Sequence, residues 1–112
     1  MTEILDGLGA ARTLKYTHNA ALTAGDEIVI NGQVWVAVND TLADVENVFV
    51  YRGKCRFPKE PAVAHAIGDV LYWDDTNNYA TKTVGTNAKI GMCLDAAASA
   101  DTETEAMLRE NA

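Results

Sequence analysis

The side chains that could do chemistry in this chain are few and poorly arranged for an active site. Ser99 is its single serine and lies in an alanine-rich run, without the Gly-x-Ser-x-Gly turn that exposes a nucleophilic serine. His18 and His65 are far apart in the sequence and match no common metal-ligand spacing. General-base catalysis by either histidine needs a positioned partner that the sequence does not indicate. We predict that the protein is not an enzyme and that both histidines are structural or surface residues.

The remaining candidates for metal, cofactor or redox chemistry are also weak. Asp74 and Asp75 are adjacent, but Tyr79 stands where a calcium loop needs an oxygen ligand, so the segment predicts a turn. Cys55 and Cys93 form no Cys-x-x-Cys motif, and we interpret them as buried thiols that would pair only after late oxidation and with close Cβ atoms. No phosphate-binding glycine motif is present. We therefore expect no metal and no cofactor.

Composition and charge narrow the class of protein. A chain of 112 residues with 48% hydrophobic content is expected to form one domain with its own core. The net charge of −7 disfavours nucleic acid as a partner, because phosphate binding needs clustered Lys and Arg. No apolar run approaches the roughly 20 residues of a membrane span, and the acidic start resembles no signal peptide. We expect a protein that is made in a cytoplasm and does not bind membranes.

The charges are unevenly distributed along the sequence. Four basic residues, Arg52, Lys54, Arg56 and Lys59, lie close together, whereas the C-terminal part collects acids at Asp95, Asp101, Glu103, Glu105 and Glu110. One interpretation is two solvated surfaces; the other is that basic and acidic patches meet between neighbouring copies or on a partner. The second interpretation makes the four basic residues, together with Trp35, candidates for an oligomer interface.

A β-hairpin is the clearest local prediction. Asn31-Gly32 takes the positive φ angles of a two-residue type I′ turn and lies between the apolar segments 27–30 and 33–38. This turn predicts that Ile30 pairs with Gln33, and the alternation then makes both faces of the hairpin apolar. The hairpin must be covered on both sides, by the second layer of its own domain or by another subunit.

The rest of the chain predicts a mainly β domain. We expect a flexible arm over residues 1–12, strands over 13–17, 48–51, 54–57, 69–73, 79–84, 88–94 and 104–109, and one short helix over 61–67. Residues 24–30 resemble residues 67–73, since in both a Gly-Asp pair precedes an apolar strand. Chance is one explanation of this echo, and two similar half-sheets around one core are the other.

The order of these segments resembles the phage capsid cement family over roughly residues 13–110. The resemblance is carried by Gly-Asp-x-x-Tyr-Trp-Asp at 68–74 and Ile-Gly at 90–91, with further support from residues 24–26, 34–38, 51–53, 57–59 and 106–109. It implies a compact, β-tulip or barrel-like decoration domain over 13–112, with no catalysis. It also implies a place on the capsid exterior of a virion, with the major capsid protein as partner and a homotrimer as the usual assembly.

An arm that becomes ordered on the shell would widen the contact with it. The candidate capsid-binding residues are accordingly Thr2, Glu3, Ile4, Leu5, Leu8 and Arg12. The alternative to capsid stabilisation is a phage tail-associated or host-directed adaptor that binds a protein or a glycan.

Overall fold

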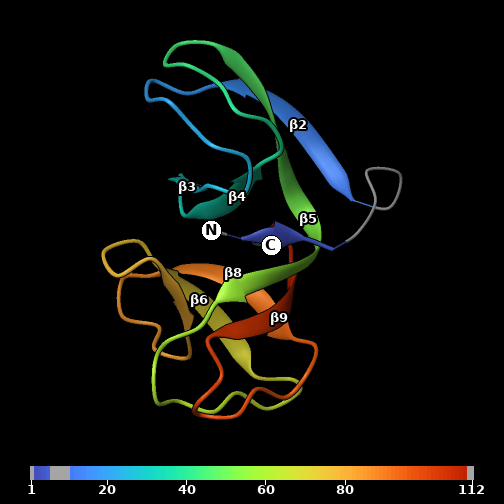
Figure 1. Ribbon diagram of the computed structural model, residues 1–112, viewed down its shortest axis with the longest axis vertical. Helices are drawn as coiled ribbons and strands as arrows, with labels where there is room; N and C mark the ends of the chain where they lie inside the picture. The colour runs from blue at the N-terminus through green and yellow to red at the C-terminus, as the bar shows by residue number, and fades with distance from the viewer. Residues whose placement is uncertain (1, 6–10, 111–112) are drawn as a thin grey trace.

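A computed structural model describes residues 2–5 and 11–110 of the chain, shown in Figure 1. These residues form a nine-stranded sheet and contain no helix, which confirms the mainly β prediction. The strands are β1 (Glu3–Ile4), β2 (Arg12–Thr17), β3 (Glu27–Ile30), β4 (Gln33–Ala37), β5 (Glu46–Pro58), β6 (Val70–Asp74), β7 (Tyr79–Thr81), β8 (Ala88–Cys93) and β9 (Glu103–Leu108).

The predicted hairpin is confirmed as β3 and β4. Asn31 and Gly32 have φ angles of 50° and 76°, and Ile30 pairs with Gln33 as the turn requires. Both apolar faces are covered within the chain itself. Val34 lies in the larger hydrophobic cluster, whereas Ile28 lies in a smaller cluster on the other face.

The two Gly-Asp turns that resemble each other in sequence have the same structure. Gly25 and Gly68 have φ angles of 91° and 93°. In each turn the following aspartate, Asp26 or Asp69, accepts a hydrogen bond of 2.8 Å from the backbone N–H three residues earlier. Each turn therefore uses glycine for its left-handed backbone and aspartate to satisfy an amide before a strand begins.

The correspondence extends through the sheet. After the two turns, β3 pairs with β4 and β6 with β8, and Ala37 and Cys93 occupy matching positions beside Phe49 and Ala106. The order β3-β4-β5-β2 in residues 12–50 thus matches the order β6-β8-β9-β5 in residues 53–108. We call these segments repeat 1 and repeat 2; Figure 1 shows repeat 1 above and repeat 2 below, joined by β5. The sequence echo therefore reflects two similar half-sheets.

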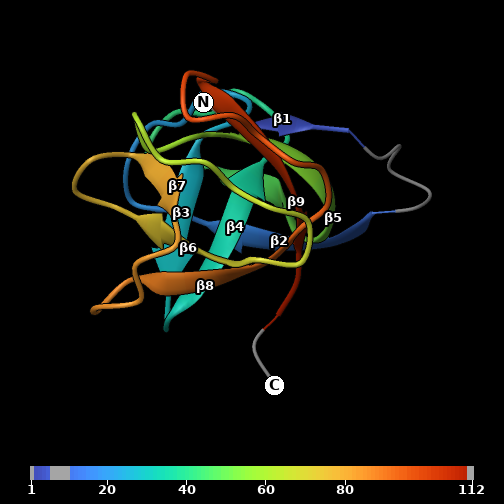
Figure 2. The ribbon, with the colours of Figure 1, turned by 90° about the horizontal axis from the view of Figure 1, so that it is seen from below.

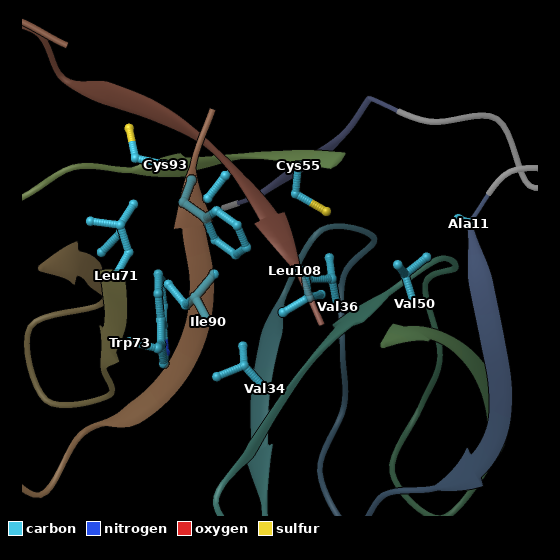
Figure 3. Close-up of a cluster of buried hydrophobic side chains, with 13 residues drawn as sticks. Ala11, Val34, Val36, Val50, Cys55, Leu71, Trp73, Ile90, Cys93 and Leu108 are labelled. Carbon is cyan, nitrogen blue, oxygen red and sulfur yellow. The ribbon is translucent and has the colours of Figure 1, made fainter. Parts of the chain in front are cut away.

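Each repeat encloses apolar side chains. In repeat 1 the rings of Tyr16 and Trp35 meet edge to face at 5.4 Å, and Phe49 lies beside both. The larger cluster fills repeat 2 and the space between the repeats, as Figure 3 shows, and includes Trp73 and Phe57 with ring centroids 6.1 Å apart. Aromatic rings therefore contribute to the hydrophobic clusters of both repeats.

The Ile-Gly pair forms an irregularity in β8. Leu71 pairs with Gly91, but the next residue, Tyr72, pairs with Lys89, so Ile90 is the extra residue of a β-bulge. The bulge allows Ile90 and Gly91 to be buried in succession. It therefore places an isoleucine in the core where strict alternation would turn it outward.

Two predictions need correction. Residues 2–5 do not extend as an unpaired arm, because β1 pairs with β5 and Thr2 is buried, while Arg12 already belongs to β2; residues 6–10 lie outside the described part of the chain. The predicted helix over 61–67 is wrong. Ala62 has a φ of 63°, and His65 forms an isolated bridge with Ala97, so the backbone bonds across the structure instead of along a helix.

Candidate interaction surface

The basic residues of β5 lie on the outer face of repeat 2. Along this strand Gly53, Cys55 and Phe57 are buried, so the intervening Arg52, Lys54 and Arg56 point away from the core. Two of them form ion pairs with acidic residues of the same chain. The nitrogen–oxygen distances are 3.1 Å for Arg56 to Glu3, 3.4 Å for Arg56 to Glu105 and 3.4 Å for Arg52 to Glu110. The basic segment and part of the acidic C-terminal segment thus meet within one subunit.

Beside these charges, apolar side chains cross the outer face of the sheet. The pairing brings Lys54 next to Met107, Met107 next to Met92, and Met92 next to Val70. Met92 is 46% exposed and Val70 is 43% exposed. We call these four residues the outer row. Exposed apolar groups flanked by charged residues are typical of a surface that contacts another protein.

Lys59 does not belong to this surface. Only 4% of the residue is exposed, and its Nζ donates hydrogen bonds to the backbone carbonyl oxygens of Glu60 at 2.8 Å, Val63, and Ser99 at 3.4 Å. Its ammonium joins the 60–63 loop to the loop around Ser99 and is not presented to a neighbouring copy. The assignment of Lys59 to an oligomer interface is therefore corrected to an internal role. Trp35 is half-buried beside Tyr16 and Phe49 in repeat 1, so part of its ring packs inside the subunit.

The candidate capsid-binding residues fall into different environments. Thr2 is buried, and its N–H donates to the carbonyl of Gly25 at 2.8 Å. Ile4 contacts the larger hydrophobic cluster, whereas Arg12 is exposed at the start of β2. Leu8 lies outside the described residues. The candidate capsid-binding residues are therefore divided. Thr2 and Ile4 pack inside the fold, whereas Arg12 is exposed on β2.

His65 is part of a buried polar network. It is 2% exposed; its Nδ1 lies 3.2 Å from Thr104 Oγ1, and Cys93 Sγ lies 3.7 Å from the same oxygen. Its Nε2 has no hydrogen-bond partner among the described residues. Burial lowers the pKa of His65, and the nearby positive charges of Lys59 and Lys82 lower it further. Burial and the neighbouring ammonium groups therefore favour the neutral form of the imidazole.

The two cysteines lie on different strands of repeat 2. Cys55 and Cys93 both pair with Ala106, from opposite sides of β9, and both side chains are buried. Two strand spacings separate their Cα atoms by about 10 Å, beyond the reach of a disulfide. Figure 3 shows their sulfur atoms pointing in different directions. The expectation that both cysteines are buried is confirmed.

The adjacent acids at 74 and 75 belong to a turn, as predicted. The Asp74 carboxylate accepts hydrogen bonds from the backbone N–H groups of Thr76 and Asn77, both at 3.0 Å, and from the Asn77 side chain at 2.9 Å. These bonds lower the pKa of Asp74. Within residues 2–5 and 11–110, no three His, Cys, Asp or Glu side chains are grouped so that they could hold a metal ion.

Sequence reasoning missed the apolar part of the outer face. Met92 and Met107 lie in strands that were predicted, but their exposure depends on the β8 bulge and on which strand is the neighbour. The available signal was alternation in 103–108, where Thr104, Ala106 and Leu108 turn inward and leave Met107 outward.

These features define a small β-protein whose exposed chemistry suits contact with another protein. A family model described as phage cement protein matches residues 9–109, and the chain therefore belongs to the phage cement protein family. Membership associates it with a structural role at the phage capsid and with a location in the virion. A comparison with curated protein sequences gave no match. No helix in the described part of the chain has the length and apolar character needed to cross a bilayer.

Proposed function

We propose that this protein decorates the exterior of an assembled phage head and stabilises the shell. Membership of the cement family over residues 9–109 carries the proposal, and the exposed outer face supports a role in protein contact. A ligand that binds only the assembled shell stabilises it by mass action, about 2.7 kcal/mol per site when its free concentration is a hundred times Kd. Many modest contacts are therefore sufficient.

We further propose that the protein acts as a homo-oligomer, a trimer, and that the outer row lies in the contact between copies. Covering Met92 and Val70 would remove exposed apolar surface from water. Arg52 and Arg56, already paired within their own subunit, would border this contact and favour one orientation over others.

Shell binding is proposed for those members of the N-terminal candidate set that the core does not use. Thr2 is buried and Ile4 packs on the larger hydrophobic cluster, so we retain Glu3 and Arg12, which are exposed, and Leu5, which is half-buried. Leu8, which lies outside the described residues, is retained from the sequence alone. Deletion of residues 1–12 is a poor test of this role, because it also removes β1 and uncovers the edge of β5.

The test of the main proposal is co-sedimentation of the intact chain with expanded, undecorated heads of its own phage. We expect saturable binding and heads that resist heat or chelation better when decorated. Absence of binding to any form of the head, together with binding to tails or host cells, would establish the adaptor alternative instead.

The oligomer proposal is tested separately by sedimentation equilibrium. Met92→Glu, which puts a charge into the outer row, should shift the protein toward monomer. Leu42→Glu is the matched control, because Leu42 is 76% exposed on a loop of repeat 1. Equal association of both variants and the unchanged protein would remove the outer row from the interface.

A further inference from the structure

The two repeats differ in how their sheet edges are covered. In repeat 2 the outer edge of β5 is paired with β1, and the outer edge of β6 is paired with β7. The matching strands of repeat 1 are β2 and β3, and within the described residues β2 pairs only with β5 and β3 only with β4. Figure 1 shows β2 along a margin of the molecule, and Figure 2 shows β7 beside β6. As far as residues 2–5 and 11–110 show, repeat 1 therefore has open edges where repeat 2 has paired ones.

The backbone groups that β2 leaves unpaired can be identified from the pairing of β5. Val38 donates a hydrogen bond of 2.9 Å to the carbonyl of Val48, so the backbone of Val48 faces β4. Polar groups alternate along a strand, so Phe49 faces β2 and bonds with its partner Leu14. The alternate residues of β2 then direct their N–H and C=O groups to the open edge; these are Thr13, Lys15 and Thr17.

β1 shows how such an edge is filled in this fold. The N–H of Leu5 donates to the carbonyl of Lys54 at 2.9 Å, and Glu3 pairs with Arg56. Lys54 and Arg56 hold in repeat 2 the positions that Thr13 and Lys15 hold in repeat 1, as the matching pairs with β9 and β5 indicate. The open edge of β2 thus presents the same pattern of donors and acceptors that β1 uses.

The side chains on β2 indicate what kind of strand fits there. Lys15 is exposed on one face together with Thr13 and Thr17, and Arg12 is exposed at the start of the strand, in a chain whose net charge is −7. Leu14 and Tyr16 are half-buried on the other face, against the smaller hydrophobic cluster, so part of their surface is left uncovered. An added strand would therefore place acids beside Lys15 and apolar residues beside Leu14 and Tyr16.

A second copy of β2 is a poor occupant. Pairing β2 with itself would bring two sets of Arg12 and Lys15 together with no acidic side chain on either strand, and like charges across a sheet are destabilising. The strand that fills the matching edge in repeat 2 instead brings Glu3 to Arg56, at 3.1 Å.

We propose that the open edge of β2 receives, as an added strand, an extended segment of the shell protein in which acidic and apolar residues alternate. This inference rests on the proposed capsid function and specifies how the shell is bound. Strand addition supplies main-chain hydrogen bonds for affinity and alternate side chains for specificity.

The test is a proline at the position whose N–H faces the edge. Lys15→Pro removes a donor to the incoming strand, while the β2–β5 bonds remain, because the Lys15 backbone does not bond with β5. We expect binding to undecorated heads to weaken about tenfold or more, through the lost bond and the disturbed neighbouring ones. Lys15→Thr keeps the N–H and loses only the charge, so we expect about a threefold loss, smaller at high salt.

Hydrogen exchange provides a readout that does not depend on a variant. In the unchanged protein, amides of peptides that cover residues 12–18 should exchange more slowly when the protein is on heads. If heads bind the unchanged protein but neither protect this segment nor discriminate against Lys15→Pro, the edge inference is overturned and the proposed function stands. If heads do not bind the unchanged protein, the proposed function itself fails. Protection of the same amides in free protein, with self-association that Lys15→Pro abolishes, would assign the edge to a second copy and overturn the inference.

Discussion

Replacing Gly91 with alanine should damage this fold far more than the same replacement at Gly32. Gly91 lies in the β8 bulge with a φ of 151°, and a Cβ built there would stand 1.9 Å from the carbonyl oxygen of Met107 on β9. Gly32, at the tip of the β3–β4 hairpin, has a φ of 76° and nothing within 4 Å of a built Cβ. Both positions strain an L side chain, but only Gly91 also has a steric obstacle.

The magnitudes follow from these geometries. At Gly32 the left-handed backbone alone should cost about 1–2 kcal/mol. At Gly91 a backbone strain of about 1–3 kcal/mol is joined by overpacking of about 1–3 kcal/mol. The obstacle is a main-chain oxygen, so relief requires β8 and β9 to move apart at their closest pairs, with loss of about 1 kcal/mol per ladder bond. We expect Gly91→Ala to lower the free energy of unfolding by about 3–6 kcal/mol.

Urea denaturation followed by tryptophan fluorescence measures this difference, because each repeat contains one tryptophan, Trp35 or Trp73, and the combined signal covers both. Gly32→Ala is the control for the effect of glycine on the unfolded chain, which is common to both variants. The expected result is a midpoint for Gly91→Ala well below that of Gly32→Ala, or a chain that does not fold. Equal midpoints would refute the proposed close approach of β8 and β9.

Three further outcomes are expected. Lys59→Met should lower the free energy of unfolding by about 2 kcal/mol in urea titrations, because three backbone carbonyls lose their donor; no loss would show that solvent replaces it. Leu22, whose bridge with Thr41 in repeat 1 corresponds to the bridge of His65 with Ala97, shows that leucine suits this position. His65→Leu should abolish a loss of stability in acid. The pKa of His65 is lowered in the folded state, so its contribution to the free energy of unfolding is intact above the unfolded value of 6.5 and declines as pH falls below that value. Urea midpoints at about pH 5 and about pH 7.5 will show whether the variant lacks this decline. Reductant should leave the urea midpoint unchanged, and Cys55 and Cys93 should both react with a thiol reagent after unfolding without reductant; a chain with neither thiol reactive would contradict the strand positions.

Local turn chemistry explains why much of the fold could be predicted. Asn31-Gly32 set the hairpin register without reference to the rest of the chain, since few residue pairs tolerate two positive φ angles. Gly68-Asp69 likewise indicated where β6 begins. The segment 61–67 misled for the opposite reason: its alanine content favours a helix, but the pairing of His65 with Ala97 is a long-range contact that local propensity does not contain.

The interaction surface was predictable only in part. The basic residues of β5 could be found by inspection, but their pairing with Glu3 and Glu110 depends on strands that come from the two ends of the chain. β1 itself has only two residues and no periodicity, so its position becomes evident only when the edge of β5 that it fills is known. Lys59 shows that a charged residue need not be exposed, because its ammonium donates hydrogen bonds to three backbone carbonyls inside the fold.

The length of β5 has a consequence for how the molecule unfolds. This strand has 13 residues and belongs to both repeats: it is an inner strand of repeat 1 and the last strand in the order of repeat 2. Its Phe49 lies in the smaller hydrophobic cluster and its Phe57 in the larger one. If either repeat unfolded, β5 would lose strand partners, and the other repeat depends on β5. The chain should therefore unfold in a single cooperative transition, with the amides of β5 exchanging only through global opening, and neither repeat should persist as an autonomous folding unit.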